Sequence, residues 1–106
     1  GLWWERLLPL VKVSTKAILS GCELSERSCE MLAPVIGDRW SSLRELDLSN
    51  NRLMDSGVNL MWSGLESQDL QLEALRLSFC DLTGKSCESL ASVLSSQSSS
   101  LRELDL

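Results

Sequence analysis

The sequence predicts an α/β solenoid, in which short parallel strands and helices alternate along the chain and stack side by side. Two observations predict it. Apolar residues recur with a fixed period of 29 positions through most of the 106 residues, and each period has two halves that differ in hydrophobic spacing. Because strands stack about 4.8 Å apart and helices about 10 Å apart, such a stack bends into a horseshoe. The strands then line the concave face and the helices the convex face.

The repeat is most visible in the octapeptide SSLRELDL, which occurs at residues 41–48 and again at 99–106. Around the first copy the apolar residues follow the pattern L-x-x-L-x-L-x-x-N-x-L, and the same framework recurs 29 residues later with Cys in place of Asn. This spacing is the signature of a leucine-rich repeat at the long end of its range of lengths. The framework residues are Leu43, Leu46, Leu48, Asn51 and Leu53 in one unit and Leu72, Leu75, Leu77, Cys80 and Leu82 in the next.

Each unit begins with a strand and continues with a helix. In LRELDL, Leu46 and Leu48 alternate with charged residues, which is the period of a half-buried strand. In the second half of a unit the apolar residues lie at i, i+3, i+4 and i+7, which defines one face of a helix. This helical face consists of Cys87, Leu90, Ala91 and Leu94 in the third unit. Expected N-caps of the three helices are Ser25, Asp55 and Thr83.

The chain divides into an apolar N-terminal capping segment, residues 1–13, and a repeat region, residues 14–106. The repeat region holds about three units of 29 residues and a truncated fourth strand. Pro9 is expected to interrupt the capping segment, and Pro34 to shorten or kink the first repeat helix. Since the last unit stops at Leu106 without its turn and helix, we expect the chain to be a fragment of a longer protein.

Composition argues against several classes of function. Acidic residues outnumber basic ones by 15 to 10, which disfavours binding to nucleic acid or to an anionic membrane. The absence of His and Tyr removes the commonest general base and a common proton donor, so we expect no enzyme. The four Cys lack a C-x-x-C pair, which disfavours a metal site and favours free thiols in a reducing compartment. No cofactor is expected.

The ninth position of the framework is the turn that follows each strand. Asn51 holds it in the middle unit, with Cys22 and Cys80 on either side. A small polar side chain at this point can satisfy backbone groups that the turn leaves unpaired. We therefore interpret Cys22, Asn51 and Cys80 as structural residues, while a redox role for the two Cys is the alternative.

Two repeat types alternate, because residues 18–48 match residues 76–106 better than they match the unit between them. Alternating 28–29-residue units with Cys or Asn at the turn resemble the ribonuclease-inhibitor subclass of leucine-rich repeats. More narrowly, SSLRELDLSNNRLMDSGVNLM and LRLSFCDLTGKSCESLASVL resemble the repeats of the NOD-like receptors of fish. The resemblance implies a cytoplasmic innate-immune receptor whose repeats sense ligands or restrain a preceding nucleotide-binding domain. The chain itself contains no G-x-x-x-x-G-K-[ST] phosphate loop.

A binding surface, if the repeats have one, is expected on the concave strand face. Arg76 should lie between Asp47 and Asp105 on neighbouring strands, either as a recognition stripe for a protein partner or as a self-neutralising ladder. Trp40 and Trp62 are the alternative site, as an exposed aromatic patch, or else they are half-buried surface residues. The outward residues of the concave face are Lys16, Ile18, Ser20, Glu45, Asp47, Ser49, Ala74, Arg76, Ser78, Glu103 and Asp105.

Three hypotheses of function follow. The first is a protein-interaction module of an intracellular innate-immune receptor, whose partner is another protein or the receptor's own nucleotide-binding domain. The second is a purely structural repeat fragment with no ligand of its own. The third is a protein binder outside immunity that resembles ribonuclease inhibitor.

Overall fold

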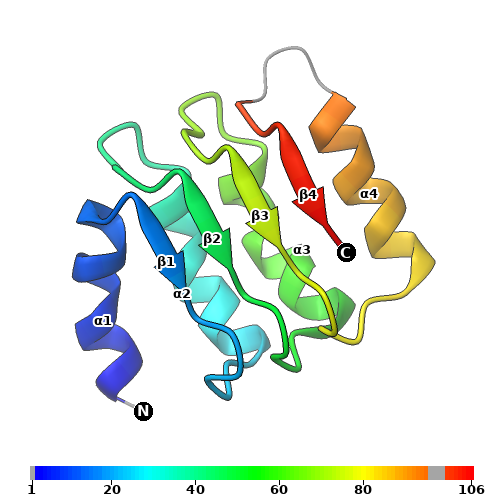
Figure 1. Cartoon of the computed structure of the whole chain (residues 1–106), viewed down its shortest axis with the longest axis horizontal. Coiled ribbons are helices and arrows are strands. Elements are labelled where there is room, and N and C mark those ends of the chain that lie inside the picture. Colours follow the sequence, from blue (N-terminus) through cyan, green and yellow to red (C-terminus); the bar gives the residue numbers. More distant parts are fainter. Residues whose placement is uncertain (1, 96–99) are drawn as a thin grey trace.

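A computed structural model describes residues 2–95 and 100–106 of the chain. Ser99, the first residue of the second SSLRELDL, lies outside these residues. Helices and strands alternate strictly, as the 29-residue period predicts (Figure 1). The elements are α1 (Leu2–Val13), β1 (Lys16–Ile18), α2 (Glu26–Ile36), β2 (Glu45–Asp47), α3 (Met54–Leu65), β3 (Ala74–Arg76), α4 (Gly84–Ser95) and β4 (Glu103–Asp105).

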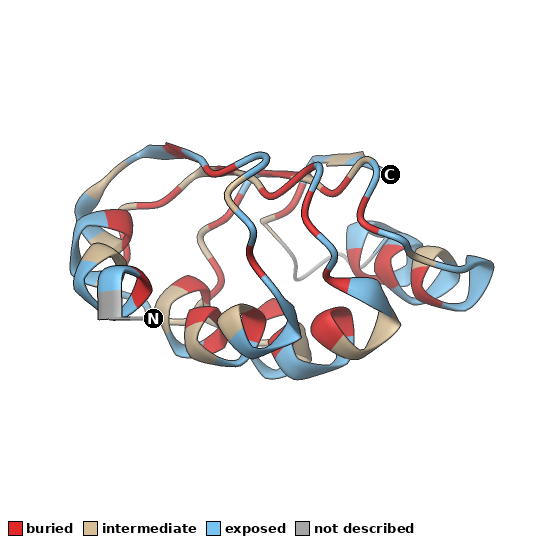
Figure 2. Ribbon diagram, turned by 90° about the horizontal axis from the view of Figure 1, so that it is seen from below, coloured by how far each residue is buried: buried red, intermediate tan, exposed pale blue. Residues whose placement is uncertain are grey.

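The strands form one parallel sheet in the order β1-β2-β3-β4. Its register follows the repeat, since Leu46 of β2 lies opposite Ala17 of β1 and Leu75 of β3, each 29 residues away. The strands form one layer and the helices fan out beneath it over a wider arc (Figure 2). This arrangement confirms the predicted α/β solenoid.

The core lies between these two layers. The residues of β1, β2 and β3 that point toward the helices are buried, whereas Leu104 of β4 is only partly buried. Apolar residues on the inner side of α2, α3 and α4 are buried as well. Burying a Leu side chain stabilises a fold by about 1.5–3 kcal/mol. The periodic leucines therefore contribute most of the hydrophobic free energy that holds the stacked units together. The largest fully buried side chains are Leu32, Ile36, Leu43, Leu46, Leu48, Leu53, Met61, Leu65, Leu72, Leu75, Leu77 and Leu90.

Helix α1 packs beside α2 at the outer edge of β1. The indole of Trp4 is buried against the core, and its Nε1 donates a hydrogen bond to the carbonyl oxygen of Ser28 at 3.2 Å. The expected interruption at Pro9 is wrong, because α1 continues through it. Pro9 lies on the exposed side of the helix, where water can solvate the carbonyl that its missing N–H leaves unpaired.

Pro34 also has a smaller effect on α2 than expected. It is exposed and occupies the last turn, and the helix still runs to Ile36. At 11 residues α2 is one residue shorter than α3 and α4. Ile36, the last residue of α2, is equivalent to Leu65, the last residue of α3, so α2 does not end early at its proline. A proline near the end of a helix removes only a single hydrogen bond, and α2 keeps its packing.

The helix N-termini are capped partly by the neighbouring unit. Ser25 caps α2 as predicted, with its N–H donating to the hydroxyl of Ser28. The prediction for Asp55 is wrong, because Leu53 is the N-cap of α3. The carboxylate of Asp55 instead accepts hydrogen bonds from Thr83, the residue before α4, and from Ser86. The hydroxyl groups of Ser86 and Thr83 hold the pKa of Asp55 below its usual range.

Candidate functional site

The candidate surface is the concave face, defined as the outward side chains of β1–β4 and of the residues that follow the first three strands. The structure places its eleven predicted members at different depths. Lys16, Ile18, Ser20, Glu103 and Asp105 are exposed, Glu45, Asp47, Arg76 and Ser78 are half-buried, and Ser49 and Ala74 are buried.

Ser49 and Ala74 are therefore corrections to the predicted surface. Ala74 lies in register between Glu45 and Glu103, whose longer side chains leave its methyl group little exposure. The hydroxyl of Ser49 accepts a hydrogen bond from the N–H of Ser78 at 3.1 Å. Both residues belong to the framework of the sheet and offer almost no area to a partner.

Arg76 lies in register between Asp47 and Asp105, as the sequence predicts. Its guanidinium nevertheless pairs with Glu103, at 3.3 Å between Nη2 and Oε2. Asp47 instead accepts a hydrogen bond from the N–H of Ser49 at 3.0 Å. Within residues 2–95 and 100–106, neither Asp47 nor Asp105 takes part in an ion pair. The ladder thus leaves two carboxylates that form no ion pair within the described chain.

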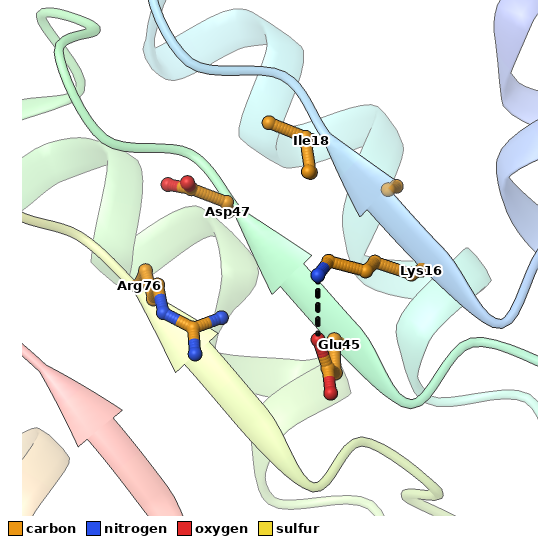
Figure 3. Close-up of a pocket in the computed structure, with 6 residues that line it drawn as sticks. Lys16, Ile18, Glu45, Asp47 and Arg76 are labelled. Carbon is orange, nitrogen blue, oxygen red and sulfur yellow. Dashed lines mark ion pairs between the residues drawn. The ribbon is translucent and has the colours of Figure 1, made fainter.

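A second ion pair on this face joins Lys16 to Glu45, at 3.5 Å between Nζ and Oε2 (Figure 3). Beside it lies an open pocket of about 230 Å³, lined by Lys16, Ala17, Ile18, Glu45, Asp47 and Arg76. Exposed ion pairs contribute at most about 1 kcal/mol each. A partner can therefore displace these contacts at low cost and bring its own charged or polar groups to the pocket.

The turns at the edge of this face are closed by the ninth framework residue. Asn51 is 2% exposed, and its Oδ1 accepts hydrogen bonds from the N–H groups of Cys22 and Leu24 at 3.1 and 2.9 Å. Its Nδ2 donates to the carbonyl oxygens of Leu19 and Leu48, at 3.0 and 2.9 Å. The side chain thus ties two consecutive turns together, which agrees with the structural interpretation.

The two Cys at the equivalent position make fewer bonds than Asn51. The Sγ of Cys80 is buried and donates to the carbonyl oxygen of Leu48 at 3.1 Å. Cys22 is only half-buried, and its Sγ lies 3.6 Å from the carbonyl oxygen of Ser20. Of the two helix cysteines, Cys29 is buried, whereas Cys87 is half-buried and not on the fully buried face.

Burial separates the four thiols chemically. It raises the pKa of Cys29 from its ordinary value of 9.0 to about 12, and it also raises the pKa of Cys80. At pH 8 iodoacetamide should therefore alkylate Cys22 and Cys87 first, because Cys29 then holds roughly a thousandfold less thiolate than a thiol of ordinary pKa. Stability should also fall above about pH 9, since the unfolded chain then loses the Cys29 proton more readily than the folded chain.

Peptide mass spectrometry of the native and the urea-unfolded protein tests this prediction. Unfolding should expose Cys29 and Cys80 to the reagent and bring all four thiols to similar rates. Equal alkylation of the four thiols in the native protein would contradict the burial described above.

The tryptophans do not form a shared patch on one element. Trp40 lies in the loop before β2 and is 79% exposed, whereas Trp62 lies on α3 and packs half-buried against the core. Trp40 thus fits the alternative of an exposed aromatic residue, and Trp62 fits the alternative of a half-buried surface residue.

Phe79 is the exposed residue that the sequence reasoning missed. It follows β3 and is 82% exposed, with φ of +59°. Its equivalents at the same point of the preceding turns are Gly21 and Asn50, with φ of +64° and +61°. Aligning these three positions would have found it, because Gly and Asn tolerate this left-handed conformation and Phe does not.

Residues 2–95 and 100–106 contain no group of three or more His, Cys, Asp or Glu that could hold a metal ion. None of their helices is long and apolar enough to cross a membrane.

Comparison with known proteins supports the repeat assignment. One Leucine Rich Repeat family model matches residues 42–64, and a second Leucine Rich repeat model matches residues 71–91. The chain is 43% identical to ribonuclease inhibitor of Sus scrofa over 91 residues, which is 86% of this chain and 20% of that protein. It is also 43% identical to the human NACHT, LRR and PYD domains-containing protein 12 over 88 residues, 83% of this chain and 8% of that protein.

The mouse counterpart of the second relative is 46% identical over 85 residues, again covering 80% of this chain and 8% of that protein. The chain thus spans a fifth or less of the curated relatives it matches. Together the matched models, the 29-residue register and the single parallel sheet identify the architecture. The chain is a leucine-rich-repeat region whose units are similar to those of ribonuclease inhibitor and of the NACHT, LRR and PYD domains-containing proteins.

Proposed function

We propose that this region is a protein-interaction module that binds its partner on the concave strand face. The observation that carries the proposal is the pair of carboxylates, Asp47 and Asp105, which flank Arg76 without forming an ion pair within the described chain. If the charged residues of this face served only to stack the strands, each carboxylate would be expected to form an ion pair with a basic residue of a neighbouring strand. Solenoids also use such extended inner surfaces to bind large partners.

The proposal extends to the protein that contains the region. Similarity to NACHT, LRR and PYD domains-containing proteins supports an intracellular innate-immune receptor of the NOD-like type, with the fish members as the narrower assignment. In such a protein, residues 14–106 would contact either a separate protein or the receptor's own nucleotide-binding domain. Residues 1–13 would cover the edge of the first unit, where Trp4 already packs. The module has no catalytic role and needs no cofactor or metal.

Charge reversal at Arg76 tests the proposal. In the full-length protein, Arg76→Glu would place three like charges in one row across β2, β3 and β4, with Glu103 beside them. Binding to the partner, or to the nucleotide-binding domain as bait, should change at least tenfold, or about 1.4 kcal/mol, as measured by quantitative pull-down.

Arg39→Glu is the matched control, since Arg39 forms an ion pair with Asp69 at 3.8 Å and lies outside the concave face. It should leave binding unchanged. If Arg76→Glu keeps its circular dichroism spectrum and binds like the wild type, the concave face is not the contact surface. The structural-fragment hypothesis would then be preferred.

A further inference from the structure

Phe79 stands in a backbone conformation that its side chain disfavours. The three turns that follow β1, β2 and β3 all adopt positive φ at the same point, with Gly21, Asn50 and Phe79 in sequence. A Cβ in this region crowds the following carbonyl oxygen, and only Gly and, less often, Asn or Asp adopt it routinely. A bulky aromatic residue is a marked exception.

The side chain of Phe79 contributes little buried area to the fold. The phenyl ring is 82% exposed, the largest exposed fraction among the exposed large apolar side chains of the described chain. It lines the rim of a small pocket of about 150 Å³, together with Leu106 and Asp81, but most of the ring faces solvent. Local strain without compensating burial is a pattern found at functional sites.

The surroundings of Phe79 indicate what it would contact. Phe79 lies in the turn after β3, three residues beyond Arg76, so it stands at the rim of the concave face, roughly 10 Å along the chain from the row that contains Asp47 and Asp105. Arg76 is engaged by Glu103, and the two aspartates have no ion-pair partner in residues 2–95 and 100–106. An exposed aromatic ring on the same face as carboxylates that form no ion pair complements a segment that presents apolar and basic side chains together.

We propose that Phe79 is the anchor residue of the concave face, held in a left-handed turn so that its ring projects into a partner segment of mixed apolar and basic character. This inference rests on the proposed function and adds to it the residue that makes the apolar contact. Asp47 would receive the basic group of the partner, and Phe79 its apolar group.

The chain contains a single phenylalanine, which makes a direct measurement possible. Incorporation of 4-fluorophenylalanine gives one ¹⁹F resonance, from position 79. We would titrate the labelled chain with three octapeptides, built from two blocks each of Arg-Arg-Leu-Leu, Arg-Arg-Ser-Ser or Glu-Glu-Leu-Leu. The first should bind most tightly and shift the resonance in a saturable way, the second should bind more weakly, and the third should not bind.

Phe79→Asn provides the second test, because Asn50 occupies the same turn position in the preceding unit. This variant should raise the thermal unfolding midpoint by about 4 °C through relief of strain, yet weaken Arg-Arg-Leu-Leu binding at least fivefold. Binding of the Arg-Arg-Ser-Ser peptide should not change. Trp40→Ser is the matched control, since Trp40 is equally exposed and should affect neither property.

The outcomes distinguish the role of Phe79 as anchor residue from the proposed function of the concave face as a binding surface. Unchanged binding in Phe79→Asn, combined with a loss in Asp47→Asn, would overturn the anchor and leave the concave face standing. Unchanged binding in both variants would overturn both. A lower unfolding midpoint in Phe79→Asn would show that the ring holds the fold, and would overturn the inference, as would a failure of the wild type to bind the Arg-Arg-Leu-Leu peptide.

Discussion

Replacement of Asn51 by Leu is expected to destabilise the protein by about 3–5 kcal/mol, the largest effect of any single substitution at the concave edge. The side chain of Asn51 is 2% exposed and accepts hydrogen bonds from the N–H groups of Cys22 and Leu24. Leucine has the same branching at Cγ but is larger and cannot accept them. Two backbone donors would then be left without partners, at about 1–3 kcal/mol each. Three carbonyl groups, those of Leu19, Leu48 and Ser49, would also lose the Nδ2 donor.

The loss should be measured as a shift of the urea midpoint with an unchanged slope. Asn51→Cys is the informative intermediate, because Cys80 occupies the same position in the next unit and donates to the carbonyl oxygen of Leu48. A thiol replaces one donated bond but accepts N–H bonds poorly, so its cost should be smaller than that of Leu.

The neighbouring residue supplies the control for Asn51. Asn50 is exposed and has φ of +61°, so Asn50→Gly should be neutral or slightly stabilising. A cost below about 1 kcal/mol for Asn51→Leu would mean that water or a rearranged turn satisfies the amides. The role given to Asn51 would then be wrong.

The backbone could be predicted in detail from the sequence, because the period of 29 converts directly into register. Leucines that recur at equivalent positions must meet the same core, so residues 29 apart pair across neighbouring strands. Apart from the interruption expected at Pro9, the predictions that failed concern side chains. Arg76 has the predicted neighbours, but its long, flexible side chain reaches the diagonal Glu103 instead. Register places Cα atoms and does not choose among several carboxylates within reach.

Two further features depend on contacts between units that a local pattern does not contain. Asp55 bonds to residues at the start of the next helix and does not cap its own, because its carboxylate accepts hydrogen bonds from Thr83 and Ser86. Hydrophobic periodicity could not identify Phe79, because it contains no information about the dihedral angles of a turn. The same position in the other turns, held by Gly21 and Asn50, did carry that information.

Gly64 is expected to be the second most sensitive position, because α2 packs directly against it. A Cβ added there would lie 2.4 Å from the carbonyl oxygen of Ala33 and 2.7 Å from Cγ1 of Ile36. A Cβ added at Gly37, the C-cap of α2, would lie 3.0 Å from the Cα of Gly64. A backbone atom cannot rotate away as a flexible side chain can, so the two helices must separate to admit any side chain.

Gly64→Val should therefore destabilise the protein by about 3 kcal/mol or more, although valine stands at the equivalent positions 35 and 93 of the other helices. The higher helix propensity of valine returns only a few tenths of a kcal/mol. The substitution would push α3 away from α2 and open the core around Ile36 and Leu65, both of which are buried.

A graded series of alanine variants distinguishes this steric explanation from a general effect of glycine. Gly84→Ala, with nothing within 4 Å of the added Cβ, should be neutral or stabilising. Gly57→Ala meets the Cβ of Leu53 at 3.0 Å and the Sγ of Cys29 at 3.3 Å, and should give a moderate loss. Gly64→Ala should give the largest loss of the three in urea unfolding. If Gly64→Ala is instead as stable as Gly84→Ala, the close packing of α2 on α3 does not limit stability, and a different interface holds the stack together.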